Sequence, residues 1–449
     1  MIPPKPTGRP RKVSLWRFAK LFRKDILSAL PDHLFKAQMA EFKTPFFRSF
    51  LVNDPALINR VLKERPLDFP KSDRIAEGLR PLLGKTSVFL TNGTEWQRQR
   101  RLIDPAFEGG RLRDTFNAML AAGEAACVRM QPGAIDIEPE TSHAAADVIF
   151  RTLFSIPITD DIAARTFQAF RAYQRTQPIL NPAALFALPK WLPRFHRRGV
   201  RKQANIIRGL IAELVDQRAA AIAEGTAPDD LATKIMTTTD VVSGARFSSA
   251  EMIDQVAIFF LAGHETSASA LAWALYLLAT HPDAQQRVAE EGIDFLKNPL
   301  FSNLSSLKFT RDVFRETLRL YPSVPMMVRE TTKDEPLRAR IAKKGAQIVL
   351  SPWHLQRHQE MWDSPDDFNP DRYTTENAKQ CLRDAYLPFS TGPRVCIGAG
   401  FAMIEGPMLL AMLVSRFNFA PSGPPPIPAA YLTLRSRDGI RLQIAHRLS

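Results

Sequence analysis

A long apolar segment near the middle of the chain is the strongest constraint on the fold. Residues 256–279 read VAIFFLAGHETSASALAWALYLLA and are nearly long enough to span a bilayer. Glu265 lies at the centre of this segment, where an acid in mid-bilayer would cost at least about 2.5 kcal/mol. We therefore expect a core helix over residues 248–280, about 50 Å long at 1.5 Å per residue. Ser248 and Glu251 fit a capping box at its start, and Pro282 stops the pattern.

Helical patterns also dominate the rest of the chain. Strand signals are fewer, and no segment reads as a clean linker between domains. We therefore expect a mainly α fold with a small β region, in which a basic, proline-rich tail over residues 1–13 precedes a single domain over residues 14–449. The expected helices cover residues 54–64, 95–103, 205–223, 307–320 and 401–416, and the expected strands lie within 47–52 and 338–351.

The cysteine content and the net charge limit the cellular compartments and the binding partners to be expected. Three cysteines without paired spacing argue against a disulfide framework, and residues 3–12 lack the apolar core of a secretory signal, so we expect a cytoplasmic protein. The net charge of +14 suggests anionic partners, but the basic residues are scattered, so we expect no nucleic acid. Residues 14–24, SLWRFAKLFRK, are typical of a surface-lying helix. We favour a terminal helix docked on its own domain, with no membrane partner, in a monomeric protein.

One thiol stands in a position unusual for a structural cysteine. In FSTGPRVCIG, residues 389–398, Cys396 precedes a helical pattern, and a helix N-terminus favours the thiolate. Gly392 and Gly398 permit close approach of something flat or bulky. Without a CxxC motif or nearby Cys and His residues, this thiolate cannot build a zinc or iron–sulfur site, whereas a single thiolate fits a haem iron.

The same stretch resembles the haem-binding signature of the cytochrome P450 family, Phe-x-x-Gly-x-Arg-x-Cys-x-Gly, at all five defined positions. The resemblance implies a soluble, bacterial-type member with the P450 fold, a long central helix over the haem, and haem b as cofactor. It makes Cys396 the iron ligand. Phe389 and Gly398 are then cofactor-binding residues of the same loop.

The hexamer AGHETS, residues 262–267, resembles the oxygen-activation segment of that family. Ala262 and Thr266 are four residues apart, so they share the helix face that would look at the iron. Gly263 makes room beside the cofactor, Thr266 would hydrogen-bond bound dioxygen, and Glu265 would relay protons. We expect His264, a position that the family leaves variable, to be structural.

Two further motifs resemble those of the family. Glu316 and Arg319 in RETLRLYP match Glu-x-x-Arg, and Arg372 in FNPDRY matches the third member of a buried structural triad. Tyr373 stands where phenylalanine is commoner. A separate departure is Pro407, which follows Gly406 and predicts a kink in the helix after Cys396.

The haem propionates require cations or other donors. WQRQR, residues 96–100, resembles the family's Trp-x-x-x-Arg, so Trp96 and Arg100 are expected partners, with Arg394 and Arg329 as further ones. For Arg98 and Arg101 a solvated helix face and a docking patch for an acidic electron donor are equally good interpretations.

The resemblance implies a monooxygenase that hydroxylates a C–H bond of a hydrophobic small molecule with O2. Electrons would come from NAD(P)H through a separate ferredoxin and ferredoxin reductase. A peroxygenase, a haem-thiolate isomerase and a haem sensor are the alternatives, and the Glu265–Thr266 pair argues against them. Fatty acid, terpenoid, steroid and aromatic substrates all stay open. The residues expected around the substrate are apolar, and core packing is an equally good interpretation of each: Leu82, Val88, Phe89, Ile258, Phe259, Ala262, Val324, Met326 and Met327, with the loop at 179–188.

Overall fold

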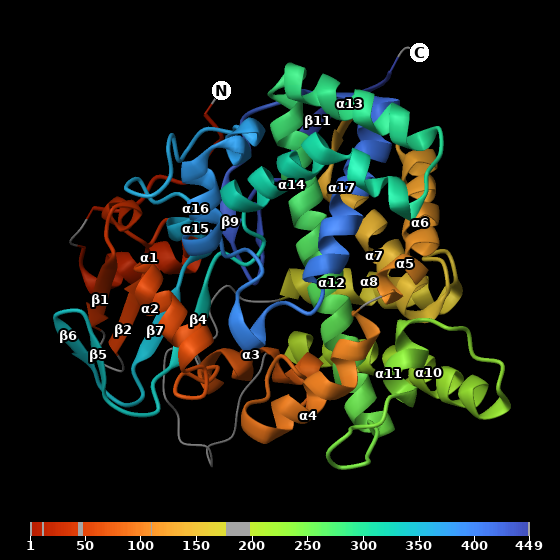
Figure 1. The fold of residues 1–449 in the computed structure, drawn as a ribbon, viewed down its shortest axis with the longest axis horizontal. Coiled ribbons are helices and arrows are strands. Elements are labelled where there is room, and N and C mark those ends of the chain that lie inside the picture. The colour runs from red at the N-terminus through yellow and green to blue at the C-terminus, as the bar shows by residue number, and fades with distance from the viewer. Residues whose placement is uncertain (1, 11–12, 44–47, 109, 177–197, 448–449) are drawn as a thin grey trace. The chain divides into compact units, whose positions relative to one another are not determined.

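The long apolar segment forms one helix, α12, which runs without a break over Ser249–Ala279 (Figure 1). The expected capping box is present, because the Glu251 N–H donates to Ser248 Oγ at 3.3 Å and the Ser248 N–H donates to the Glu251 carboxylate at 2.8 Å. Most of its side chains from Val256 onward are buried, so α12 is a core helix as predicted. Among the described residues, α17 (Ala399–Arg416) is the helix long and apolar enough to cross a membrane, and 67% of it is buried in the protein.

The structure, a computed structural model, describes residues 2–10, 13–43, 48–108, 110–176 and 198–447. The chain divides into two compact units. The first comprises Met1–Phe69, Gly123–Ser142 and Thr266–Ser449, and the second comprises Pro70–Ala122 and His143–Glu265. Helix α12 passes from the second unit into the first between Glu265 and Thr266.

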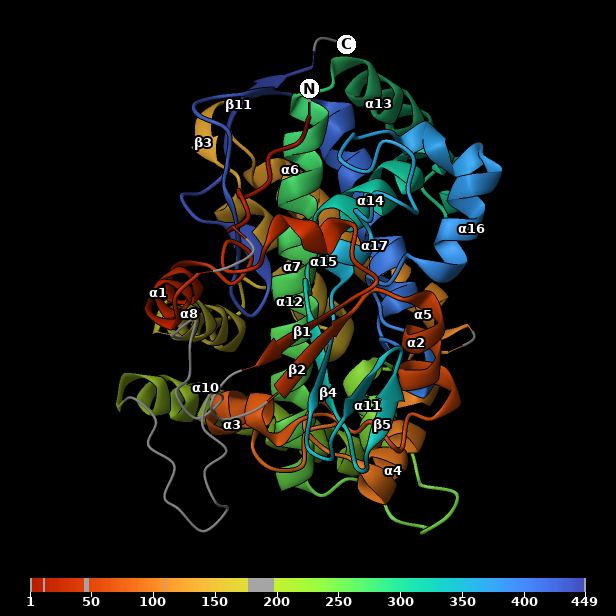
Figure 2. The same cartoon turned by 90° about the vertical axis from the view of Figure 1, so that its left-hand side faces the viewer.

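The first unit holds a mixed sheet in the strand order β1-β2-β7-β4 (Figure 2). Its strands are β1 (Met39–Lys43), β2 (Arg48–Val52), β7 (Gln347–Leu350) and β4 (Met327–Glu330). β2 pairs with β7 in parallel, and the other pairs are antiparallel. Phe50 and Val52 point into one apolar cluster while Leu51 packs with Leu30 and Leu34 in another. Because alternate residues of a strand face opposite sides, the apolar residues Phe50–Val52 of β2 are buried on both faces, whereas Arg48 at the start of the strand is exposed.

The remaining strands of the first unit form smaller sheets. The segment 338–351, expected to be β-structured, contributes to two different sheets, because β6 pairs with β5 and β7 pairs with β2 and β4. These strands are β5 (Glu335–Leu337) with β6 (Arg340–Ala342), β3 (Gly133–Asp136) with β11 (Arg441–His446) and β8 (Phe417–Pro421), and β9 (Pro428–Ala430) with β10 (Leu434–Ser436).

Helices outnumber strands in residues in both units, as the sequence patterns predict. The expected helix at 54–64 is a short α-helix, α2, followed by a π-helical turn over Arg60–Glu64. The first unit contains α1 (Leu15–Lys24), α2 (Pro55–Asn59), α13 (Pro282–Leu296), α14 (Lys308–Leu320), α15 (Pro352–Leu355), α16 (Glu376–Asp384) and α17. The second contains α3 (Asp73–Leu83), α4 (Gly93–Ile103), α5 (Arg111–Asp114), α8 (Asp161–Thr176), α10 (Arg198–Glu224) and α11 (Leu231–Thr237). Helices α6 (Phe116–Arg129) and α7 (Glu138–Phe154) contribute to both units.

Candidate active site

Cys396 lies in the turn that leads into α17, and its thiol is exposed, whereas Cys127 and Cys381 are buried. The Cys396 N–H donates to the carbonyl of Phe389 at 2.9 Å, which closes the loop. Burial raises the pKa of Cys127 and of Cys381 to about 11, so neither thiol ionises readily at neutral pH. The chain therefore presents one accessible thiol, and it stands at a helix N-terminus, where a negative charge is favoured.

The two glycines of this loop serve different purposes. Gly392 has φ +73°, and a Cβ atom built on it would lie 2.0 Å from the carbonyl oxygen of Leu62, so the protein backbone itself requires glycine there. Gly398 has φ −84°, and a Cβ atom on it would meet no described atom within 4 Å. The packing of the described residues therefore does not require glycine at 398, and the open space there would let a flat group such as a haem lie against the loop.

Helix α12 carries a partly accessible strip along its otherwise buried length. Phe259, Ala262, Gly263 and Thr266 are exposed or half-buried, and their spacing of three and four residues places them on one face. Glu265 is buried, at 5% exposure, on another side of the helix. A Cβ atom on Gly263 would lie 2.5 Å from Ile149 Cδ1, so Gly263 also allows α7 to pack closely. The accessible strip fits a group lying along this face.

His264 is buried and its ring stacks edge-on against Phe167 of α8, at 5.5 Å between ring centroids. Phe167 makes a second edge contact with His143 at 5.7 Å. These contacts agree with the structural role expected for His264.

A buried carboxyl group next to the oxygen-activation segment was not anticipated from the sequence. Ser267 Oγ donates to Glu405 Oε2 of α17 at 2.7 Å, and the other carboxyl oxygen of Glu405 has no partner among the described residues. Burial raises the pKa of Glu405 to about 8, and the hydrogen bond from Ser267 opposes this only in part. The signal available in the sequence was an acid inside the apolar run of α17.

The expected structural triad is present and fully buried. Arg319 forms a bidentate pair with Glu316, with both N–O distances 2.8 Å, and Arg372 Nε donates to the same carboxylate at 2.9 Å. The Tyr373 hydroxyl, at the position that departs from the family pattern, also donates to Glu316 at 2.9 Å. The two guanidinium groups hold the pKa of Glu316 below its usual value against the effect of burial.

Helix α17 continues through Pro407 to Arg416 as one helix. A Cβ atom on Gly406 would lie 2.2–2.6 Å from atoms of the Phe314 ring of α14, so glycine is needed there for the two helices to pack.

The residues expected at the propionates fall into two groups. In the second unit Trp96 and Arg100 lie one turn apart on α4, with the guanidinium carbon 5.9 Å from the ring centroid, and Arg100 Nε donates to Asp104 at 2.6 Å. In the first unit Arg394 is half-buried at the end of the short turn Gly392–Arg394. Arg329 of β4 is 5% exposed and donates to the Val328 carbonyl at 3.1 Å.

Arg329 carries its charge in an apolar setting. Burial lowers its pKa to about 10, and within the described part of the chain it forms no ion pair with a carboxylate. A buried guanidinium without a carboxylate partner fits an anionic group such as a propionate.

The structure favours one interpretation of Arg98 and Arg101. Arg98 pairs with Glu95 and Glu251, and Arg101 forms a bidentate pair with Asp240 at 2.5 and 3.1 Å. Because their charges are compensated locally, these residues belong to the salt-bridged face of α4 more than to a patch for an acidic partner.

The expected substrate residues divide by burial. Leu82, Val88 and Ile258 are buried, as core residues would be, while Phe89, Phe259 and Val324 are half-buried. Met326 packs on the cluster around Leu34, and Met327 packs on the cluster around Phe50. The expected loop at 179–188 lies outside the described residues.

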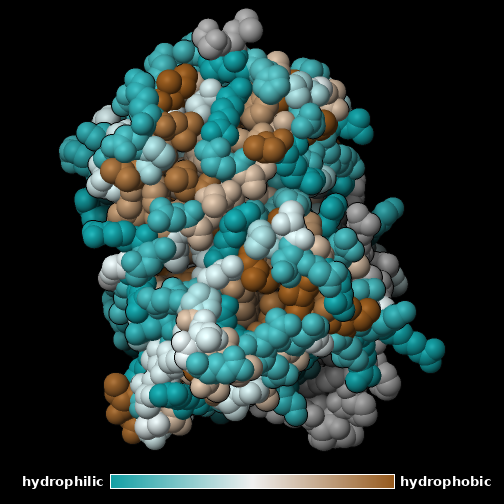
Figure 3. All heavy atoms as spheres, turned by 90° about the vertical axis from the view of Figure 1, so that its right-hand side faces the viewer, coloured by the Kyte–Doolittle hydropathy of each residue, from teal (hydrophilic) through white to brown (hydrophobic). Residues whose placement is uncertain are grey.

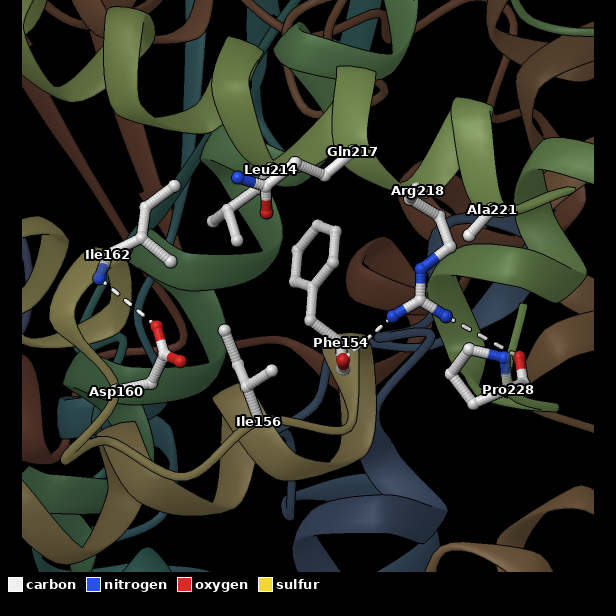
Figure 4. A pocket seen from close by; sticks show the side chains of 9 residues that line it. All are labelled: Phe154, Ile156, Asp160, Ile162, Leu214, Gln217, Arg218, Ala221 and Pro228. Carbon is white, nitrogen blue, oxygen red and sulfur yellow. Dashed lines mark hydrogen bonds between the residues drawn. The ribbon is translucent and has the colours of Figure 1, made fainter. Parts of the chain in front are cut away.

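A pocket of about 180 Å³ in the second unit shares no residue with the predicted site (Figure 4). The ring of Phe154 lies between apolar side chains and the guanidinium of Arg218, whose donors bind the Phe154 carbonyl at 2.7 Å and Thr233 Oγ1 at 2.8 Å. The pocket is lined by Phe154, Ile156, Asp160, Ile162, Leu214, Gln217, Arg218, Ala221 and Pro228.

The surface of the molecule is mixed in character. Figure 3 shows several separate apolar patches on one face, each surrounded by hydrophilic side chains.

Known proteins resemble this chain over nearly its whole length. The sequence model of the cytochrome P450 family matches residues 3–442. A cyclooctat-9-en-7-ol 5-monooxygenase of Streptomyces melanosporofaciens is 32% identical over 418 residues, which cover 91% of this chain and 87% of the relative. A pentalenene oxygenase of Streptomyces avermitilis is 33% identical over 358 residues, 78% of each chain. The crystal structure of the cytochrome P450DA heme domain aligns with a TM-score of 0.81 at 24% identity, covering 100% of this chain and 98% of that one.

These matches confirm the expected fold and the resemblance noted in the sequence. The family implies a haem cofactor, O2 and a small-molecule substrate, with electrons delivered by redox partners. The chain belongs to the cytochrome P450 family and is an oxidoreductase that incorporates oxygen from O2.

Proposed function

We propose that this protein is a haem b monooxygenase that inserts one atom of O2 into a C–H bond of a hydrophobic terpenoid. The observation that carries the proposal is the single exposed thiol, Cys396, at the start of α17, beside two buried and poorly acidic thiols. When bound, the haem supplies the activation of O2, and the protein supplies orientation, proton delivery and exclusion of water.

We assign the chain's own residues as follows. The Cys396 thiolate ligates the iron, and Phe389 and Gly398 hold the loop against the macrocycle. Ala262 and Gly263 provide the face of α12 along which the cofactor lies. The propionates are bound by Trp96, Arg100, Arg394 and Arg329.

Thr266 and Glu265 are the proposed catalytic residues. The half-buried Thr266 belongs to the accessible strip of α12, and its carbonyl accepts a hydrogen bond from Ser323 Oγ at 2.8 Å, which fixes the helix backbone at this point. The hydroxyl of Thr266 holds a proton beside the reacting oxygen, and the buried carboxyl of Glu265 supplies the next proton.

The relatives narrow the substrate class. Two Streptomyces enzymes at 32% and 33% identity are named for the oxidation of cyclooctat-9-en-7-ol and of pentalenene, both of them terpenoids. The apolar residues expected around the substrate suit a compound of this class. We propose that half-buried residues, such as Phe259 and Val324, contact it.

We further propose that residues 14–449 act as one domain of a monomeric, cytoplasmic enzyme. Its electrons come from NAD(P)H through a separate ferredoxin and ferredoxin reductase. The family's dependence on redox partners supports the delivery of electrons by a separate protein. The choice of a ferredoxin as that protein rests on the resemblance to bacterial members.

The test combines a spectrum with a coupling measurement. The reduced, carbon-monoxide-treated protein should show the red-shifted Soret band of a thiolate-ligated haem, and Cys396→Ala should abolish it. With ferredoxin, reductase and NADPH, a cyclic terpene hydrocarbon should be hydroxylated. Thr266→Ala should divert most of the electrons to hydrogen peroxide, while Thr266→Ser, which keeps the hydroxyl, should stay largely coupled. Equal coupling in wild type and Thr266→Ala would refute the role of Thr266, and a normal Soret band in Cys396→Ala would refute the site itself.

A further inference from the structure

Helix α1 presents an aromatic side chain to solvent. Trp16 is 88% exposed, whereas Trp96, Trp273, Trp353 and Trp362 are all buried. The helix starts at the Ser14 cap, where Ser14 Oγ accepts the Arg17 N–H, and it contains four basic residues and no acid. On a helical wheel Trp16 falls among these basic positions, opposite Phe18 and Phe22.

The other face of α1 is attached to the protein. Phe18 and Phe22 are half-buried, with ring centroids 5.6 Å apart, and the Arg9 guanidinium lies over the Phe18 ring. Asp25, which caps the end of α1, accepts hydrogen bonds from the Leu27 N–H at 3.1 Å and from the Ala430 N–H of β9 at 3.0 Å. The helix is therefore fixed through its apolar face and its C-terminus, and Trp16, Arg17 and Lys20 are exposed on the opposite face.

The two described cations of this face are not compensated by a carboxylate within the described part of the chain. Arg17 and Lys20 are exposed and form no ion pair with any described residue. Arg98 and Arg101 of α4, in contrast, are matched by Glu251 and Asp240. An exposed tryptophan beside exposed basic residues on a helix without acids is the composition of helices that lie at the boundary between lipid headgroups and acyl chains.

We propose that α1, besides being held to its own domain as expected, docks on an anionic phospholipid surface, which revises the expectation of no membrane partner. Its basic residues contact the headgroup phosphates, and the Trp16 indole inserts at the headgroup boundary. A protein partner is the weaker match, because a helix of ten residues, about 15 Å long, offers much less than the ~800 Å² per partner of a standard protein interface. For a hydrophobic substrate, such docking would place the enzyme where the substrate accumulates.

The test is sedimentation of the full-length holoenzyme with vesicles. The wild type should pellet with vesicles of equal parts phosphatidylcholine and phosphatidylglycerol, but not with phosphatidylcholine alone, and salt should release it. Each basic residue near such a surface contributes roughly fivefold, so Arg17→Ala/Lys20→Ala should bind about 30-fold more weakly. The matched control is Lys308→Ala/Arg311→Ala on α14, which removes the same charges at the same spacing from another exposed position and should bind as the wild type does.

Tryptophan fluorescence gives an independent readout. Anionic vesicles should shift the emission of the wild type to the blue, and Trp16→Phe should remove most of this shift. All variants should keep the carbon monoxide spectrum, which shows that folding is intact. Three outcomes would each overturn the proposal. The first is that the wild type binds neutral vesicles as well as anionic ones, and the second is that the α14 control loses as much vesicle affinity as Arg17→Ala/Lys20→Ala does. The third outcome is that Arg17→Ala/Lys20→Ala binds vesicles normally but accepts electrons slowly from a donor protein. The last outcome would make α1 a protein interface.

Discussion

Glu405→Gln should change how stability depends on pH. Glu405 is 1% exposed, and within the described part of the chain its carboxyl group has one hydrogen bond, from Ser267. Because burial raises its pKa to about 8, the folded protein holds a proton at pH 7 that the unfolded chain, with an ordinary glutamate pKa, releases. For a raised carboxyl pKa the stabilising contribution is complete at acid pH and is lost as the pH rises toward 8.

The magnitude follows from one proton. A difference of one bound proton changes the free energy of unfolding by about 1.4 kcal/mol per pH unit. Between pH 5 and pH 8 the free energy of unfolding of the wild type should therefore fall by on the order of 3 kcal/mol, because the slope is smaller near each of the two pKa values. Glutamine keeps the shape and can still accept a hydrogen bond from Ser267, but it does not titrate. The stability of Glu405→Gln relative to wild type should therefore increase across this range.

The assay is urea unfolding of the holoenzyme followed by circular dichroism at several pH values between 5 and 8. The exposed carboxylate Glu108, changed to glutamine, controls for removal of one acid and should give a curve nearly parallel to that of the wild type. Parallel curves for wild type and Glu405→Gln would refute the reasoning, because they would show that Glu405 titrates alike in the folded and unfolded chains.

Three other substitutions test the loop of Cys396 and the buried triad. Gly392→Ala should destabilise the protein by about 2 kcal/mol or more and lower its haem content, because a side chain at φ +73° costs 1–2 kcal/mol before the contact with the Leu62 carbonyl is counted. Gly398→Ala, with ordinary backbone angles, should leave the fold stable and alter only the haem content and spectrum, and equal unfolding midpoints for the two variants would contradict this. Tyr373→Phe should lower the free energy of unfolding by about 1–2 kcal/mol, since it deletes a buried hydrogen bond to the ionised Glu316, and an unchanged urea midpoint would show that the bond contributes nothing.

The sequence predicts most reliably those structural features that depend on residues within a single segment. The capping box of Ser248 and Glu251 and the bidentate Glu316–Arg319 pair depend on residues three apart, and the burial of α12 depends on one apolar segment; all three are present in the structure. That Ala262 and Thr266 share one face followed from helical periodicity, while the expectation that this face is open came from the resemblance to the family.

Contacts between distant segments were not predictable in this way. Ser267 and Glu405 are 138 positions apart, and no local pattern joins them. The need for glycine at 392 depends on the Leu62 carbonyl, which belongs to a different element. In the sequence Tyr373 is a mild departure from the family pattern. Its contact with Glu316, to which its hydroxyl donates a hydrogen bond, depends on a residue 57 positions away.

Helix α14 explains why a buried ion-pair triad matters to an exposed thiol. One face of α14 carries Phe314 and Leu318, four residues apart, and these pack with Ala270, Phe389 and Met403. Another face carries Glu316 and Arg319, which bind Arg372 and several loop carbonyls. Because Phe389 closes the loop through its bond to the Cys396 N–H, the triad fixes the helix on which that loop rests. Breaking a buried pair of this kind lowers the free energy of unfolding by roughly 3–5 kcal/mol. Because the loop of Cys396 rests on α14, loss of the pair should also displace the thiol.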